Sequence, residues 1–100
     1  MKVGEHIGSY KFRPGDLVVT SKYHDHPGHH GILMERIHRH GTWSWRIRWL
    51  TDMPYPYRHE KFRGAPPNVR EGTECEINLY NLRRRYHYYN KEGEYYESRY

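Results

Sequence analysis

The sequence predicts an all-β fold in which four or five short strands form a small barrel. The strongest observation is the segment of residues 43–50, where three tryptophans and Ile47 occupy every second position. Such alternation places these side chains on one face of an extended, half-buried strand. The composition agrees, because aromatic residues, which favour strands, make up 16% of the chain against 35% for all hydrophobic residues. The length of 100 residues indicates one domain with a small core.

Turn signals divide the first half of the chain into further strands. A proline and a glycine at 14–16 predict a turn before a strand at residues 17–20, since Pro presets φ and Gly accepts a positive φ. Residues 31–38 predict a second strand, and their imperfect alternation indicates a bulge or two buried sides. Gly41 lies in the turn at 39–42 that joins this strand to the central one as a hairpin.

The second half of the chain is less regular. Four prolines within residues 51–73 exclude a long regular element there, although 57–62 predicts a short edge strand. The last strand is expected within 74–82, where Cys75 and Ile77 share a face, and no helix is expected. The side chains expected to form the core are those of Val18, Trp45, Ile47 and Ile77.

We expect a domain at residues 12–82 between an N-terminal arm at 1–11 and a C-terminal arm at 83–100. The C-terminal arm contains six tyrosines and almost no aliphatic residue, so it cannot form a core of its own. Tyrosine combines a large contact area with a polar tip, which suits a surface that waits in water for a partner. The arm is therefore expected to bind a partner and to lie outside the barrel core.

Three stretches of the sequence resemble Src-homology-3-like small barrels: FRPGDLV at 12–18, HGILME at 30–35 and WRIRW at 45–49. In that superfamily a PGDLV opening, a G-I-V second strand and a V-x-W third strand recur. KOW-type and Tudor-like domains, the RNA-polymerase-interaction domain of CarD-type regulators and many small phage-encoded proteins are similar. The resemblance covers about residues 12–82 and implies a five-stranded barrel. A shared fold of this kind does not by itself fix a function.

The formal net charge of +5, with histidine neutral, predicts attraction to nucleic acid, anionic membranes or acidic proteins, although it also serves solubility alone. Arginine and tyrosine are enriched at interface hot spots, and with phosphates and bases they form ion pairs and stacks. Alternatively, Arg46 and Arg48 only form the solvent-exposed face of a strand, and the three arginines at 83–85 are only a charged segment at the end of the domain. The candidate interaction residues are Arg46, Arg48, Arg83, Arg84, Arg85, Tyr86, Tyr88, Tyr89, Tyr95 and Tyr96.

The loop at residues 24–30 contains four histidines and Asp25, which are ligand types that suit zinc or copper. The spacing H-x-H-x₂-H-H matches no recognised metal motif, so no metal is expected and the loop's role stays open. Cys75 is the only cysteine, which excludes a disulfide framework and a cysteine-based zinc site. We find no paired nucleophile and base and no glycine-rich phosphate loop, so neither catalytic residues nor a cofactor are expected.

These observations predict a non-catalytic subunit of a larger protein assembly, held by its arms and its Tyr/Arg surfaces. The resemblance to small phage proteins implies a virion component, located in the virion or the host cytoplasm. The main alternative is a nucleic-acid- or RNA-polymerase-binding regulator that uses the basic face, and a metal-dependent enzyme at the histidine loop is a weaker third. No segment has the ~18 apolar residues of a membrane span, and no signal peptide is expected.

Overall fold

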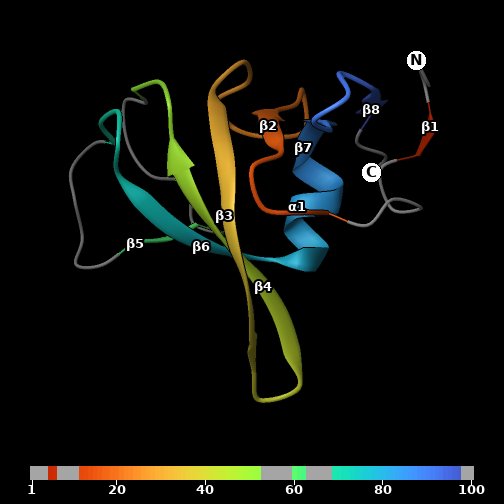
Figure 1. Ribbon diagram of the computed structural model, residues 1–100. Coiled ribbons are helices and arrows are strands. Elements are labelled where there is room, and N and C mark those ends of the chain that lie inside the picture. Colours follow the sequence, from red (N-terminus) through yellow and green to blue (C-terminus); the bar gives the residue numbers. More distant parts are fainter. Residues whose placement is uncertain (1–4, 7–11, 53–59, 63–68, 98–100) are drawn as a thin grey trace.

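The computed structural model describes residues 5–6, 12–52, 60–62 and 69–97, which form one sheet and one short helix (Figure 1). The strand order is β1-β8-β7-β2-β3-β4-β6-β5. Neighbouring strands are antiparallel except β1 and β8, which are parallel. The elements are β1 (Glu5–His6), β2 (Leu17–Thr20), β3 (His30–Arg39), β4 (Thr42–Trp49), β5 (Lys61–Phe62), β6 (Glu74–Asn78), α1 (Leu79–Arg85), β7 (Tyr86–Tyr89) and β8 (Tyr95–Glu97).

The mostly β architecture agrees with the prediction. The predicted barrel would require the sheet to close on itself, and the strand pairing does not show such closure. Within the described residues no pairing joins the edge strands β1 and β5. The expectation of no helix is wrong, because α1 follows β6 directly. No helix in this part of the chain is long and apolar enough to cross a membrane.

The turn before β2 forms as its residue types predict. Gly15 has a φ of 89°, and the amide of Asp16 donates to the carbonyl of Arg13 over 3.2 Å. The carboxylate of Asp16 accepts in return from the amide of Arg13 at 2.8 Å. A proline followed by a glycine with positive φ is the sequence that a tight turn of type II requires. The strand that follows has the predicted bounds, 17–20.

Strands β3 and β4 form a long hairpin that extends beyond the rest of the described fold (Figure 1). Its two-residue turn has His40 at φ 51° and Gly41 at φ 77°. Positive φ at both central positions gives the turn whose twist matches that of the flanking strands. The hairpin predicted around Gly41 is therefore confirmed, with each strand reaching the turn.

The irregularity predicted in the second strand is a shift of register just after Leu33. Leu33 faces the core before this bulge, and Arg36 lies opposite Trp45 after it. One extra residue reverses which alternate side chains of a strand point to a given face. The bulge therefore brings Arg36 and His38 onto the face that carries the tryptophans of β4.

The predicted core residues are buried, with Val18, Trp45, Ile47 and Ile77 exposing at most 2% of their surface. Trp43 continues the same face but exposes 42%, because the hairpin there has passed the end of the core. The buried hydrophobic cluster consists of Phe12, Val18, Leu33, Trp45, Ile47, Trp49, Val69, Cys75, Ile77, Leu82, Tyr86, Tyr88 and Tyr96.

The prediction that residues 83–100 lie outside the core is wrong. Tyr86 and Tyr88 are fully buried in β7, and Tyr96 of β8 exposes 3%. Strand β7 pairs with β2 along its whole length, on the side of β2 opposite to β3. The backbone hydrogen bonds of β7 and its buried aromatic rings stabilise the sheet, and an arm outside the core would make neither kind of contact. The folded domain therefore includes strands that the boundary at residue 82 leaves out.

Two further predictions fall partly outside the described residues. Of the predicted arm at 1–11, residues 5–6 are described, and they form the parallel edge strand β1 beside β8. Of the predicted edge strand at 57–62, residues 60–62 are described, and β5 does lie at an edge of the sheet.

Candidate functional site

The two arginines predicted on the outer face of the central strand are ion-paired. Arg46 pairs with Glu35 across the hairpin. Arg48 donates to the carboxylate of Glu74 on β6 through Nη2 at 2.8 Å and through Nε at 3.1 Å. Exposed pairs of this kind contribute about 0–1 kcal/mol to stability. The pairs also matter for binding, because each carboxylate offsets an arginine charge that would otherwise attract a phosphate group.

The predicted tyrosines divide into buried and half-buried groups. Tyr86, Tyr88 and Tyr96 lie in the core, so they present no surface to a partner, and this corrects their predicted role. Tyr89 and Tyr95 are half-buried neighbours whose ring centroids lie 4.9 Å apart. Within the described part of the predicted arm, residues 83–97, this pair still offers tyrosine surface to a partner.

The three arginines at the end of α1 lie in three different environments. Arg83 is exposed. The guanidinium of Arg84 lies 4.3 Å from the ring centroid of Tyr80, which is itself 61% exposed. Arg85 donates from Nη1 to the carbonyl of Tyr23 at 2.8 Å and so connects the helix to the loop after β2. The first two remain candidates for binding, and Arg85 has a structural role.

An exposed aromatic cluster near the tip of the hairpin was not predicted. Trp43 stacks against His38, with centroids 4.2 Å apart and planes 23° apart. The guanidinium of Arg36 lies 4.7 Å from the centroid of Trp43. The signal that points to this cluster is the bulge in β3, because it moves Arg36 and His38 to the tryptophan face.

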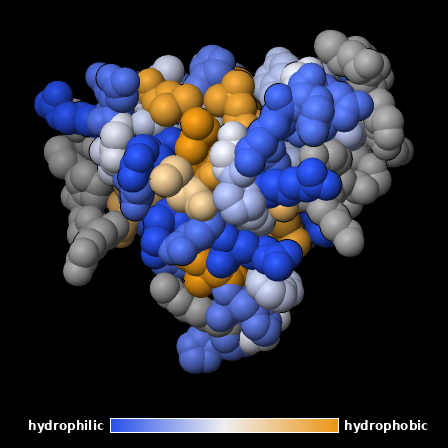
Figure 2. All heavy atoms as spheres, in the orientation of Figure 1, coloured by the Kyte–Doolittle hydropathy of each residue, from blue (hydrophilic) through white to orange (hydrophobic). Residues whose placement is uncertain are grey.

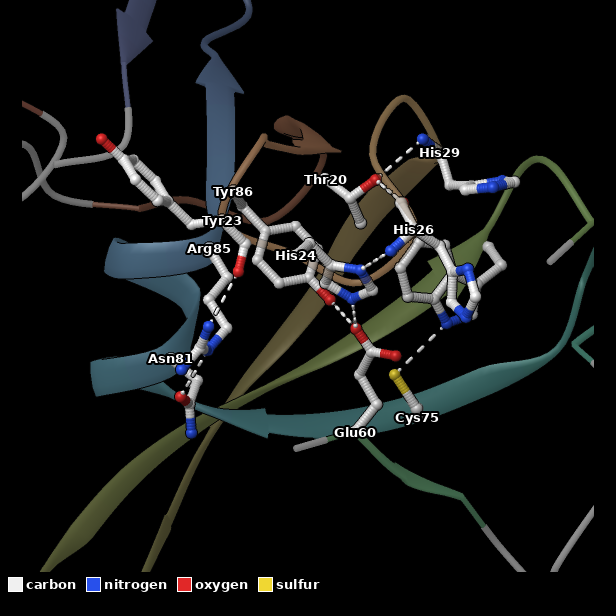
Figure 3. A network of polar contacts seen from close by, with 11 residues as sticks. Thr20, Tyr23, His24, His26, His29, Glu60, Cys75, Asn81, Arg85 and Tyr86 are labelled. Carbon is white, nitrogen blue, oxygen red and sulfur yellow. Dashed lines mark hydrogen bonds and ion pairs between the residues drawn. The ribbon is translucent and has the colours of Figure 1, made fainter. Parts of the chain in front are cut away.

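A second unpredicted arrangement is a buried polar network that includes Glu60, His24 and Tyr86 (Figure 3). His24 Nε2 lies 2.7 Å from Glu60 Oε2, and both side chains are fully buried. The hydroxyl of Tyr86 donates to the same carboxylate oxygen. The amide of His26 donates to His24 Nδ1 at 2.9 Å, so that nitrogen carries no proton and Nε2 is the donor to Glu60. A neutral histidine and a tyrosine hydroxyl thus stabilise a carboxylate inside the domain.

The histidine loop is shaped by hydrogen bonds to β2 and to Glu60. The hydroxyl of Thr20 donates to the carbonyl of His26 at 2.6 Å and accepts from the amide of His29 at 2.8 Å. Burial, followed by the charges of the neighbouring histidines, lowers the pKa of His29. Among the described residues no three His, Cys, Asp or Glu side chains are grouped to hold a metal ion. The loop is held against the domain by these hydrogen bonds, with His24 as its buried anchor.

Cys75 lies in the core, in the strand where it was expected. The indole nitrogen of Trp49 donates to its sulfur at 3.3 Å, and the residue exposes 3% of its surface. Burial, and then the negative charge of Glu60, raise the pKa of the Cys75 thiol far above its usual range. The thiolate is the reactive form of cysteine, so this environment favours an inert thiol.

Asp16 forms a smaller buried polar group at the other end of β2. One of its carboxylate oxygens, Oδ2, accepts from the hydroxyl of Tyr88 as well as from the amide of Arg13. Asp16 exposes 1% of its surface. The hydroxyls of both fully buried tyrosines of β7 therefore donate hydrogen bonds to buried carboxylates. A buried tyrosine hydroxyl needs such a polar partner.

Comparison of the chain with protein-family models, curated proteins and solved structures gave no significant match.

Proposed function

We propose that the chain is a non-catalytic binding module that works as a subunit of a larger assembly, in line with a phage-encoded virion component. The observation that carries this proposal is the projecting β3–β4 hairpin (Figure 1). Its residue Trp43 lies beyond the core and keeps 42% of its surface exposed, although it stacks on His38 of the facing strand. Such exposed aromatic residues are typical of surfaces that a partner covers.

We further propose that the sheet is a variant of the Src-homology-3-like barrel. The observation that supports this proposal is a continuous antiparallel set of five strands, β7-β2-β3-β4-β6. Those barrels also have five strands. The fifth strand of this set is β7, at Tyr86–Tyr89, rather than a strand within 12–82. The sheet continues beyond this set on both sides, with β8 and β1 next to β7 and β5 next to β6.

Copurification from the native source tests the assembly proposal. A tagged chain should elute with other protein subunits at a fixed ratio, and Trp43→Ala should reduce their recovery. Leu50→Ala is the matched control, because Leu50 is also a large apolar residue, 39% exposed, but lies outside the hairpin tip. A chain that elutes alone from its native source, or equal recovery with both variants, would contradict the proposal.

A second candidate is a regulator that binds nucleic acid or RNA polymerase, and the distribution of charge favours it. Residues 36–51 and 77–91 contain none of the 12 acidic residues of the chain. The same two stretches contain eight of its 17 Lys and Arg residues. Arg46 and Arg48 are offset by Glu35 and Glu74, so the argument depends on the other basic residues of these stretches. Clustered positive charge attracts a polyanion more strongly than the net charge alone indicates.

A further inference from the structure

Two arginine–aromatic pairs lie on elements that contact one another, the β3–β4 hairpin and α1. On the hairpin, Arg36 lies over the ring of Trp43, and on α1 Arg84 lies over the ring of Tyr80. Leu82 anchors α1 in the buried cluster that also contains Trp45 of β4, whereas Tyr80 on the same helix is exposed.

The strand register brings the two pairs near one another. Ser44, next to Trp43, lies opposite Asn78 of β6. Asn78 caps α1 by accepting from the amide of Asn81 at 2.8 Å, and Tyr80 lies in the first turn of that helix. Helix α1 also contacts β4 directly. We name these neighbouring groups together the aromatic–arginine surface, which consists of Arg36, His38, Trp43, Tyr80 and Arg84.

This surface combines accessible rings with positive charge. Trp43 exposes 42% and Tyr80 exposes 61% of its surface, even with the arginines and His38 against them. Both pairs belong to the two stretches that contain no acidic residue, 36–51 and 77–91. Arg46 and Arg48 point to the opposite face, where Glu35 and Glu74 pair with them. In the orientation of Figure 1, the projecting hairpin is covered mainly by hydrophilic residues (Figure 2).

We infer that the aromatic–arginine surface binds single-stranded nucleic acid, with unpaired bases stacked on its rings and phosphates held by its arginines. This inference rests on the second candidate function, a protein that binds nucleic acid, and it competes with the proposal of a protein partner for the same surface. Aromatic rings beside arginines suit this ligand because every base has a face that stacks and every linkage carries a negative charge. A duplex is a poorer ligand, since its bases are already stacked on one another.

Fluorescence anisotropy with a labelled thymidine oligonucleotide of about 16 nucleotides tests the inference on the full-length chain. Trp43→Ala and Tyr80→Ala should each weaken binding about fivefold or more, which is the lower end of the contribution of one stacked base. Arg36→Gln should weaken binding and flatten the dependence on salt between about 50 and 200 mM NaCl, because one fewer phosphate is neutralised. Arg70→Gln is the matched control, since it removes the same charge from an exposed position outside the surface.

The outcomes separate this inference from the proposed function. Loss of affinity in the three surface variants, with Arg70→Gln like the parent and all chains folded by circular dichroism, supports the inference. Equal losses in Arg36→Gln and Arg70→Gln, with no effect of Trp43→Ala, would overturn it in favour of diffuse attraction. No binding at about 50 mM NaCl also overturns it. If Trp43→Ala nevertheless releases a copurifying protein, the surface binds a protein and the assembly proposal stands.

Discussion

Replacing Tyr86 by phenylalanine tests whether the buried carboxylate network stabilises the fold. Tyr86 is fully buried, and its hydroxyl donates to Glu60, whose side chain is also fully buried. Tyr86→Phe keeps the aromatic ring and its packing against Trp49, where the ring centroids lie 6.3 Å apart. The variant removes the hydroxyl that donates to Glu60 Oε2 and leaves the contact of that oxygen with His24 Nε2 in place. The change in stability therefore reports on one hydrogen bond to a buried charge.

We expect Tyr86→Phe to lower the free energy of unfolding by about 2 kcal/mol, since a hydrogen bond to a charged group contributes about 1.5–3 kcal/mol. For a domain of this size, with a urea m-value of about 1–3 kcal/mol/M, the midpoint should fall by about 1 M. Tyr80→Phe is the control, because Tyr80 is 61% exposed and keeps its ring beside Arg84. The control should stay within about 0.5 kcal/mol of the parent.

A double-mutant cycle with Glu60→Gln isolates the contact. The two substitutions should be non-additive by at least about 0.5 kcal/mol, because the residues share one hydrogen bond. Two results would refute the reasoning. One is a Tyr86→Phe midpoint equal to that of the parent, and the other is strict additivity of Tyr86→Phe and Glu60→Gln.

Three further predictions follow from the core and the histidines. Trp45→Ala should cost about 3–5 kcal/mol and leave little folded chain, so an unchanged melting temperature would contradict its place in the core. Gly31→Ala should cost about 1–3 kcal/mol in a urea titration, because a Cβ there would lie 2.6 Å from Ile47 Cγ2; a neutral result would mean that this contact relaxes. Burial lowers the pKa of both His29 and His87, so the unfolded chain binds more protons below about pH 6.5 and stability should fall with acidification; replacing both histidines by glutamine should flatten this dependence, and an unchanged pH profile would contradict it.

The parts of the fold that were predicted correctly depend on residues close together in the chain. The turn at 14–16, the strand at 17–20 and the β3–β4 hairpin follow from turn residues and alternation within a few positions. The bulge in β3 was visible as a break in that alternation. Of the residues in the proposed aromatic–arginine surface, only Arg84 was among the candidates predicted from the sequence. Trp43, Tyr80, Arg36 and His38 were not, and the last two lie on this face because of the bulge. Their face depends on the bulge, which the sequence indicated without giving the side chains that it moves.

Helix α1 and strand β7 were missed because tertiary contacts stabilise both. A seven-residue helix is marginal alone, and α1 depends on burying Leu82 and on the cap at Asn78. The alternation of Tyr86 and Tyr88 with half-buried neighbours was a strand signal in the sequence. Because that segment has no aliphatic residues, it was interpreted as an exposed arm. The two carboxylates that accept hydrogen bonds from the tyrosine hydroxyls lie far away in the chain, so the segment alone does not show that its rings are buried.

By itself, the sequence determined that the chain is mostly β, that Trp43 to Trp49 alternate across a strand, and that the hairpin turns at Gly41. These features follow from steric preferences of the backbone and from period-two burial, which act over neighbouring residues. Only the tertiary structure decided that β7 pairs with β2 and that Glu60 is buried between His24 and Tyr86. Those outcomes depend on which distant groups can satisfy one another's hydrogen bonds out of water, and the local pattern of a segment does not specify its partner.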